Sequence, residues 1–262
     1  MIELGLDSKI SIGKVVVADA LRRFRAPVVV WSAGKDSTVV LDLVMKVAGE
    51  NGIKVPPVLF IDHGDHFQET WDMLHKYTKE WNLKLIVAKN EKVIESVKDG
   101  IISISDTGEE NIAEAKMIGF TGDSFPYSLD TDVGNHLLKT VAMKQAIRKY
   151  GFDALFTGIR WDENAARSTE KFYSPRDNPP HTRIHPILTF RERDIWDYMF
   201  KYDLPIHPKY KEGYRSIDGI RDSTKTSEIP AWEQDLESTK ERAGRSQDKE
   251  GMMEKLRKMG YM

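Results

Sequence analysis

Residues 27–47 read PVVVWSAGKDSTVVLDLVMKV, and this stretch decides the fold. Its first part, 27–31, is a short β-branched run of the kind found in strands buried on both faces of a sheet. Its last part, 37–47, carries Val and Leu side chains at helical spacing on one face. Between them lies a polar turn that contains Gly34. The order of strand, glycine-containing turn and helix predicts a βαβ unit and therefore a parallel sheet.

The same alternation continues along the rest of the chain. Further strands are predicted over 56–61, 83–88 and 154–157, and further helices over 11–24, 67–81, 135–150 and from Arg191 onward. We therefore expect an α/β fold, in which a twisted parallel sheet carries helices on both faces. Residues 91–134 are rich in glycine and weak in periodicity, and an irregular or partly mobile segment is predicted there. Residues 205–262 are rich in charge and turn residues, which predicts an extended C-terminal tail with a late helix.

The composition is that of a protein with a sizeable core. The chain has 262 residues, of which 40% are hydrophobic and 31% charged, and its net charge is −2. A dedicated nucleic-acid binder is usually strongly basic, so that class is not expected. No membrane-spanning run and no signal peptide is recognised, and we expect a cytoplasmic protein.

Cysteine is absent from the sequence. Disulfides, thiolate-held iron–sulfur clusters, thiol nucleophiles and dithiol redox chemistry all require this residue. None of these is expected of this chain.

The turn after the first strand has the composition of an anion site. A strand-to-helix turn directs several backbone N–H groups and the positive end of the helix dipole to one point. Gly34 permits close approach of the backbone, and Lys35 offers a cation. Ser32, Ser37 and Thr38 add hydroxyl donors. By itself the turn predicts phosphate binding, against the alternative of an ordinary polar connection.

This turn is not a Walker A motif. That motif, ending here at Gly34-Lys35, requires Gly at position 29 and Ser or Thr at position 36. The chain has Val29 and Asp36. A different kind of phosphate loop is therefore indicated.

Four segments resemble a known family. SAGKDS (32–37) looks like the SxGxDS pyrophosphate loop of the ATP pyrophosphatase superfamily, which has the adenine nucleotide α-hydrolase-like fold. FIDHGDHF (60–67) resembles the Val-Asp-Thr-Gly-x-x-Phe pattern of its phosphosulfate branch, the phosphoadenosine phosphosulfate reductase family. Residues 136–177 and 241–262 are similar to the central stretch and the C-terminal tail of the smaller, catalytic subunit of bacterial sulfate adenylyltransferase.

The resemblance implies transfer of AMP from ATP to sulfate within a catalytic domain over 1–204, followed by an extension over 205–262. The residues expected to bind ATP are Ser32, Ala33, Gly34, Lys35, Asp36, Ser37, Thr38, Asp62 and Gly158. Lys35, Arg160 and Arg167 are expected to be catalytic, with Mg²⁺ on the phosphates, held mostly by water and phosphate oxygens. The resemblance also implies a larger GTP-hydrolysing subunit, and Arg242, Arg245 and Asp248 are a candidate docking element. A homo-oligomer is left open.

Departures from the family pattern leave the acceptor open. Trp161 stands where the family has a second Arg, and the segment 177–185 is short. Adenylyl transfer to another acceptor, such as flavin mononucleotide, is an alternative, and so is a non-catalytic nucleotide-binding subunit. Reductases of the branch work through a cysteine, and GYRSIDGIRDST (213–224) resembles their cysteine-bearing stretch with both cysteines replaced. A thiol-dependent reductase is therefore not expected.

Several other residues allow two interpretations. Asp62, His63, Asp65 and His66 could be drawn as a metal site, but no further cluster at diagnostic spacing supports it, and no metal-binding residues are predicted. Asp62 is expected to hold the nucleoside or the turn that follows its strand. His136 suits either the active site or helix packing. The remaining basic residues after the fourth strand fit either anion binding or a solvated face; these are Lys171, Arg176 and Arg183.

Overall fold

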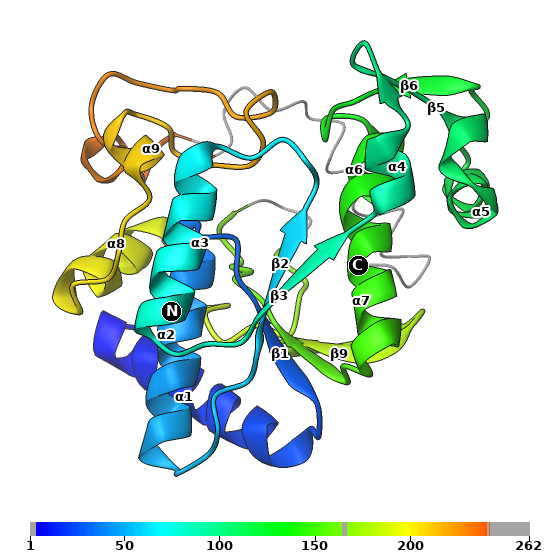
Figure 1. The fold of residues 1–262 in the computed structure, drawn as a ribbon. Helices are drawn as coiled ribbons and strands as arrows, with labels where there is room; N and C mark the ends of the chain where they lie inside the picture. Colours follow the sequence, from blue (N-terminus) through cyan, green and yellow to red (C-terminus); the bar gives the residue numbers. More distant parts are fainter. Residues whose placement is uncertain (1–3, 164–166, 240, 242–262) are drawn as a thin grey trace.

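A six-stranded sheet forms the centre of the molecule (Figure 1). The computed structural model describes residues 4–163, 167–239 and 241. The sheet has the order β3-β2-β1-β7-β9-β8. Its strands are β1 (Pro27–Val30), β2 (Val58–Asp62), β3 (Leu85–Lys89), β7 (Ala154–Phe156), β8 (Tyr173–Asp177) and β9 (Pro180–Ile184). All neighbouring pairs are parallel except β8 and β9, which are antiparallel.

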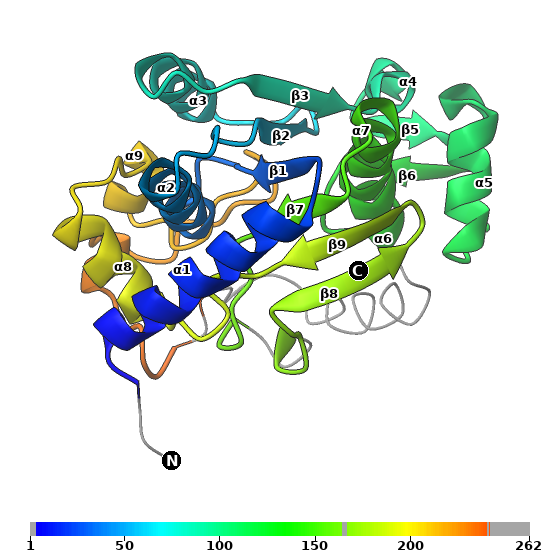
Figure 2. The ribbon, with the colours of Figure 1, turned by 90° about the horizontal axis from the view of Figure 1, so that it is seen from below.

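Helices cover both faces of this sheet (Figure 2). One face carries α1 (Leu6–Arg23), α2 (Lys35–Glu50), α3 (Gln68–Glu80) and α8 (Glu192–Lys201), and the other carries α7 (Ala142–Tyr150). Successive side chains of β1 point to the two faces of the sheet and pack against different helices. Val29 belongs to the apolar cluster of α1, α2 and α8, whereas Val28 packs with Met143 and Ile147 of α7. The predicted α/β fold is confirmed.

The helix before β7 has an irregular start and a regular end. It begins as α6 (Asp132–Asn135), continues as a π-helical turn over His136–Val141 and becomes α7. It ends at Gly151, which has a positive φ of 68° and donates its backbone N–H to the carbonyl of Ile147 at 2.9 Å. The end at this glycine is the one predicted, because glycine adopts this conformation without steric cost.

The prediction of an irregular segment over 91–134 was wrong. This region contains α4 (Glu91–Glu95), β4 (Val97–Lys98), β5 (Ile101–Ser103), a 3₁₀ turn (Ile104–Thr107), α5 (Glu109–Met117) and β6 (Ser124–Pro126). The three strands form a small antiparallel sheet beside the main one. Its core, which includes Val93, Ile102 and Phe125, is completed by Leu137 of the π-helical turn. Strands of two or three residues are too short for a period to be visible in the sequence.

The β8–β9 hairpin was also not predicted. It lies in the Arg-rich stretch that follows β7, and its buried face carries Ser174, Arg176, His181 and Arg183. The alternation that marks a strand is present, but polar side chains occupy the buried positions. An apolar pattern therefore never appears in the sequence.

Residues after 204 pack against the main core. They include α9 (Pro208–Lys211) and a 3₁₀ turn (Ala231–Glu233), and Tyr210, Ala231 and Leu236 join the cluster of α1, α2 and α8. The boundary between 204 and 205 stays a prediction, and the predicted late helix lies outside the described residues.

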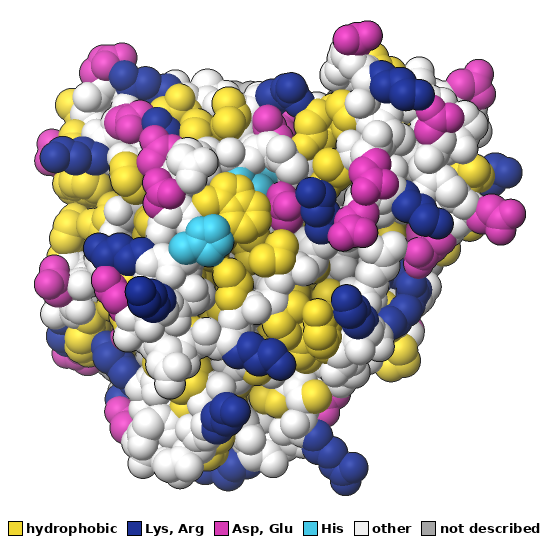
Figure 3. All heavy atoms as spheres, in the orientation of Figure 1, with side chains coloured by type: hydrophobic (Ala, Val, Ile, Leu, Met, Phe, Trp, Pro, Cys, Tyr) yellow, Lys and Arg dark blue, Asp and Glu magenta, His cyan; other side chains and the backbone are white. Residues whose placement is uncertain are grey.

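The surface and the helices agree with the balanced composition. On the face drawn in Figure 3, acidic and basic side chains are interspersed, and neither sign dominates. Within the described ranges, every helix is too short or too polar to cross a membrane.

Candidate active site

The strand order places a crevice beside β1. From β1 the chain proceeds to β2 and β3 on one side, whereas β7 pairs with β1 on the other. Ligands of open parallel sheets bind at such a point, outside the carboxyl ends of the strands. Two connections meet there: residues 31–34 after β1 and residues 157–160 after β7.

The connection after β1 forms a tight turn into α2. Ala33 has a positive φ of 59°, a conformation that favours glycine, and its side chain is buried. Gly34 is the N-cap residue of α2. Because glycine has no side chain, this residue provides no side-chain acceptor for the first N–H groups of the helix. The backbone N–H of Lys35 donates to Tyr210 Oη at 3.0 Å. The hydroxyl of Thr38 donates to the carbonyl of Gly34 at 2.9 Å, so Thr38 stabilises the turn from inside.

Gly158 brings the second connection against the first. A Cβ atom at Gly158 would lie 3.0 Å from the carbonyl carbon and the Cβ of Asp36 and from the backbone nitrogen of Ser37. Such separations are shorter than ordinary van der Waals contact. A glycine is therefore required at this position for the two connections to meet as they do.

Arg160 follows Gly158 and is completely buried. Its guanidinium donates to Asp36 through Nη1, to Asp162 through Nε at 2.8 Å and to Glu241 through Nη2 at 2.5 Å. Burial alone would lower the pKa of Arg160, but Glu241, Glu163 and Asp162 raise it above its ordinary value. The arginine therefore stays charged and ties the connection after β7 to the start of α2.

Lys35, which was expected to offer a cation to a bound phosphate, is instead buried among protein partners. Its side chain is only 1% exposed. Its Nζ donates to Glu241 Oε1 at 2.6 Å and to the carbonyl of Arg215 at 2.9 Å, and Glu192 lies at 3.6 Å. Burial lowers the pKa of Lys35, but Glu241 and Glu192 outweigh it, so the net shift is upward. No local pattern indicates that an acid 206 positions away covers this lysine.

The loop, Gly158 and Arg167 face one cavity of about 210 Å³. We call it the loop cavity; its lining includes Ser32, Gly34, Lys35, Asp36, Ser37, Gly158, Glu163, Arg167, Tyr210 and Glu241. Arg167 is 16% exposed in its side chain and forms an ion pair with Glu163. The structure thus brings six of the residues predicted from the loop and the Arg-rich stretch into direct contact with one space, together with Gly158.

A second cavity of about 250 Å³ continues from the loop cavity and shares Val30, Ser32 and Ile217 with it. We call it the side cavity. Its walls are Trp31 and Phe60 with His63, His66, Thr70, Lys139 and Asp218. Lys139 lies in the π-helical turn, a feature often found at functional sites, and pairs with Asp218.

His63 is the buried polar group of the side cavity. It is 1% exposed, and neither ring nitrogen has a hydrogen-bond partner in the described residues. Burial, followed by the charge of Lys139 and the neighbouring His66, lowers the pKa of His63 to about 2. A neutral imidazole offers one donor and one acceptor to an occupant of the cavity. His63, Lys139 and Asp218 were not predicted as site residues, although each lies in a segment that resembles the family, because the resemblance does not show that they face one space.

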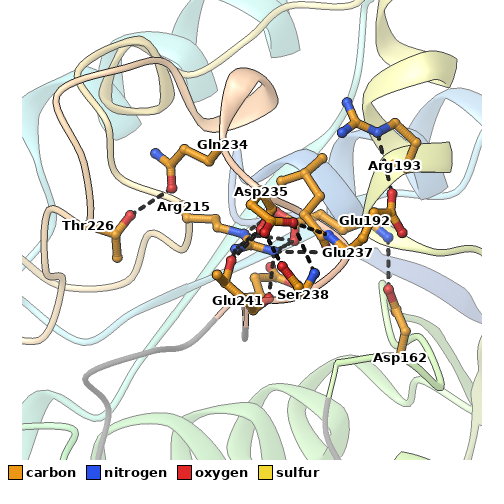
Figure 4. Close-up of polar contacts among 12 residues, drawn as sticks. Asp162, Glu192, Arg193, Arg215, Thr226, Gln234, Asp235, Glu237, Ser238 and Glu241 are labelled. Carbon is orange, nitrogen blue, oxygen red and sulfur yellow. Dashed lines mark hydrogen bonds and ion pairs between the residues drawn. The ribbon is translucent and has the colours of Figure 1, made fainter.

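A third cavity, of about 610 Å³, lies on the far side of Glu241 and is called the outer cavity. Trp161, Arg191, Arg193, Arg215 and Thr239 are among its lining residues, and Glu163 and Glu241 belong to both this cavity and the loop cavity. Arg215 organises this region (Figure 4). Its guanidinium binds the Glu192 carboxylate at 2.7 Å and donates to the carbonyls of Asp235, Leu236 and Thr239 at 3.1 to 3.3 Å.

Other candidates lie outside these cavities. Asp62 accepts a hydrogen bond from the backbone N–H of Gly64 at 2.8 Å and so holds the turn after β2. His136 is buried and bonded to Glu114 at 2.8 Å. Arg176 and Arg183 line none of the three cavities. Within residues 4–163, 167–239 and 241, no three His, Cys, Asp or Glu side chains are grouped as metal ligands.

Comparison with known proteins identifies relatives along most of the chain. Residues 26–225 match the family model for the phosphoadenosine phosphosulfate reductase domain. The chain is 31% identical over 211 residues to sulfate adenylyltransferase subunit 2 of Chelativorans sp., an alignment that covers 71% of this chain and 61% of that protein. It is 28% identical to sulfate adenylyltransferase subunit 2 of Rhizobium meliloti, with 77% and 66% covered. The chain thus spans less than two thirds of the length of these relatives.

Solved structures share the fold at lower sequence identity. Candida auris phosphoadenylyl-sulfate reductase, solved as a phosphate complex, is 19% identical with a TM-score of 0.59, and 85% of this chain and 99% of that chain are covered. Candida glabrata FMN adenylyltransferase is 16% identical with a TM-score of 0.64, and 92% and 87% are covered. These likenesses concern the fold, whereas the family match spans the sheet, the loop and the residues facing it. The chain belongs to the phosphoadenosine phosphosulfate reductase domain family.

Proposed function

We propose that this chain transfers AMP from ATP to sulfate, giving adenylyl sulfate and pyrophosphate. The observation that carries the proposal is the loop cavity, where a glycine-containing turn at the start of α2 faces Arg167 across a space shared with Gly158. Relatives named sulfate adenylyltransferase subunit 2 support sulfate as the acceptor. They leave the activity a proposal, because the chain spans only part of their length.

In this proposal the phosphates of ATP lie in the loop cavity. The start of α2, where Gly34 provides no side-chain cap, and the hydroxyls of Ser32 and Ser37 suit phosphate oxygens. Ala33 and Gly34 give the turn its shape, and Thr38 braces it from behind. The site residues proposed from sequence thus divide into groups that contact the nucleotide and groups that shape the loop.

Mg²⁺ fits this donor set as part of the nucleotide complex. Mg²⁺ is commonly held by one or two carboxylates together with phosphate and water oxygens, without a dedicated protein cage. Asp36, which lines the loop cavity at the first turn of α2, is the carboxylate in position to contribute. The ion would neutralise phosphate charge and assist departure of pyrophosphate.

The nucleoside is assigned to the side cavity. This cavity adjoins the loop cavity at Ser32, and it has aromatic walls from Trp31 and Phe60. A volume of about 250 Å³ with His63, Lys139 and Asp218 in its lining combines an apolar floor with a few polar groups, as nucleoside sites do. Asp62 contributes to it indirectly, by fixing the turn that carries His63.

The reaction needs no general base. Sulfate is already a dianion at neutral pH, so one of its oxygens attacks the α-phosphorus directly. The bond between the α-phosphorus and the oxygen bridging to the β-phosphate breaks, and pyrophosphate leaves with that oxygen. Catalysis then consists of positioning and charge neutralisation. Arg167 is proposed to hold sulfate, since a guanidinium matches the geometry of an oxyanion. Arg160 is proposed to keep the loop and the connection after β7 in register.

The equilibrium of this reaction favours ATP and sulfate, because the phosphosulfate anhydride formed is less stable than the phosphoanhydride cleaved. An enzyme cannot change this balance. We therefore propose that product formation is coupled to pyrophosphate removal or to a larger GTP-hydrolysing partner subunit, in line with the "subunit 2" in the relatives' names. The candidate docking residues Arg242, Arg245 and Asp248 lie outside the described residues.

A test of this function uses the isolated chain with Mg²⁺, ATP and sulfate. Adenylyl sulfate should stay at trace level when pyrophosphate is left in the assay and should rise when inorganic pyrophosphatase is added. Omission of sulfate is the control and should abolish the product. If pyrophosphatase and sulfate together yield no adenylyl sulfate, while flavin mononucleotide in place of sulfate yields an adenylylated product, the assigned acceptor is wrong.

A further inference from the structure

We propose that Glu241 is an internal gate of the loop cavity: its carboxylate occupies the cations that an incoming pyrophosphate group needs, and binding of that group requires Glu241 to move away. This inference rests on the proposed function. It assigns to the C-terminal segment a direct part in nucleotide binding.

The contacts of Glu241 resemble those of a bound anion. One oxygen of its carboxylate accepts from Lys35 Nζ at 2.6 Å, and the other accepts from Arg160 Nη2 at 2.5 Å. The side chain of Glu241 is 8% exposed, and Lys35 and Arg160 are 1% and 0% exposed. A carboxylate bridging two buried cations at these distances stands in for a phosphate oxygen pair.

The charge balance shows why the carboxylate and a phosphate cannot both be accommodated. Among the described residues around the loop cavity, the cations Lys35, Arg160 and Arg167 form ion pairs with Asp36, Asp162, Glu163, Glu192 and Glu241. Glu192 also pairs with Arg215, so four positive charges face five negative ones. A pyrophosphate group adds further negative charge in a poorly solvated space, where like charges repel strongly. Departure of Glu241 removes one negative charge and exposes two cations.

Glu241 is also placed as a partition between two cavities. It lines both the loop cavity and the outer cavity. The outer cavity is lined by Arg191, Arg193 and Arg215 and also by acidic residues, so the far side of the partition carries charges of both signs. Movement of Glu241 would connect the two spaces and open a path along which an anion can enter or leave.

The segment before Glu241 is held by Arg215 (Figure 4). Arg215 is 3% exposed, is anchored to Glu192 of α8, and donates to Thr239 Oγ1 and to the carbonyls of 235, 236 and 239. Lys35 in turn donates to the carbonyl of Arg215 at 2.9 Å. The turn at 235–239 is therefore fixed relative to the loop, and it presents Glu241 to Lys35 and Arg160.

The test compares binding of pyrophosphate with Mg²⁺ to wild type, Glu241→Gln and Glu237→Gln, measured by calorimetry without an acceptor. If the closed form accounts for about nine tenths of the molecules, opening the gate tightens apparent binding about tenfold. Glu241→Gln should show this gain. Glu237→Gln should not, because the Glu237 carboxylate is exposed and pairs with Arg193, at 3.6 Å, in place of Lys35 or Arg160. Weaker or unchanged binding by a folded Glu241→Gln protein would overturn the gate.

A second variant keeps the carboxylate and loosens its support. Thr239→Val removes the hydroxyl that accepts a hydrogen bond from Arg215. Pyrophosphate should again bind more tightly than in wild type, by a smaller factor than in Glu241→Gln. Unchanged or weaker binding by this variant would count against the gate even if Glu241→Gln does not fold. Acceptor assays separate this inference from the proposed function. If the variants bind pyrophosphate more tightly but the wild type shows no sulfate-dependent turnover, the gate is supported and the assignment of sulfate as the acceptor is wrong.

Discussion

Lys35 and Glu241 form a buried ion pair with an Nζ–Oε1 distance of 2.6 Å, although 206 positions separate them in the chain. The lysine belongs to the loop that starts α2, and the glutamate belongs to the C-terminal segment. Their contact ties the turn at the start of α2 to a residue near the far end of the sequence. A lysine that the sequence presents as a loop cation therefore also stabilises the fold.

Removal of this lysine should lower stability as well as activity. Lys35→Met leaves the buried Glu241 carboxylate with Arg160 and the Glu192 carboxylate with Arg215, so the loss should lie below the roughly 3–5 kcal/mol that a fully unpaired buried charge costs. The free energy of unfolding from urea titration measures the loss. The double variant Lys35→Met/Glu241→Gln should recover part of it, because the carboxylate that has lost one of its two cations is then also removed. Equal stability of Lys35→Met and wild type would mean that the pair does not form in solution.

Gly158→Ala should reduce turnover. The added Cβ would lie 3.0 Å from the backbone of Asp36 and Ser37, so the connection after β7 has to move away from the loop. We expect a loss of about 10²-fold in kcat, the size produced by small displacements of catalytic groups. Gly49→Ala on α2 is the control, since a Cβ there meets nothing within 4 Å and should leave turnover unchanged. Wild-type turnover in Gly158→Ala would show that this close approach does not matter.

Arg167 should determine the requirement for sulfate. Its side chain is partly exposed and lines the loop cavity, so Arg167→Ala should fold and should raise KM for sulfate more than KM for ATP. Arg167→Lys should recover little, because an ammonium group lacks the planar fork of arginine. Steady-state kinetics with each substrate varied in turn separates the two effects. A selective rise in KM for ATP would instead assign Arg167 to the nucleotide.

Stability should fall as the pH is lowered from about 6.5 toward 4. Burial is the main cause that lowers the pKa of His66 to about 4, compared with about 6.5 in an unfolded chain. Above pH 6.5 this group is neutral in both states. Between these values the unfolded chain binds a proton that the folded chain does not, which destabilises the fold by up to about 1.4 kcal/mol per pH unit.

Urea midpoints measured across this range test the effect. His66→Gln should show a shallower loss of stability than wild type, whereas His75→Gln, which changes an exposed histidine on α3, should show the same loss as wild type. Identical pH profiles for His66→Gln and wild type would show that the lowered pKa of His66 does not govern acid stability.

The main sheet was predictable because its signals are local. β1, β2, β3 and β7 are apolar runs next to helical patterns, and the observed bounds lie within two residues of the predicted ones. The small antiparallel sheet and the β8–β9 hairpin were not predictable, since their strands are very short or carry Arg176 and Arg183 on the buried face. Pairing between distant segments, rather than local sequence, determines these elements.

The site, like the sheet, was predictable only where its signals are local. The loop follows β1 directly and Arg167 lies in the stretch after β7, and the parallel pairing of β1 and β7 brings both stretches to one edge of the sheet. Lys139, Asp218 and Glu241 come from three segments that have no common motif. Their roles depend on packing across the whole chain, and only the three-dimensional arrangement connects them with the loop.

The most direct measurement is exchange of labelled pyrophosphate into ATP by the purified chain with Mg²⁺. The reversible transfer proposed here requires exchange that depends on sulfate, is absent without an acceptor, and is not supported by flavin mononucleotide. Sulfate should also produce label in ATP at a rate that falls sharply in Arg167→Ala. Exchange that needs no sulfate, or that appears only with flavin mononucleotide, would contradict the assignment of this chain as a sulfate-activating adenylyltransferase.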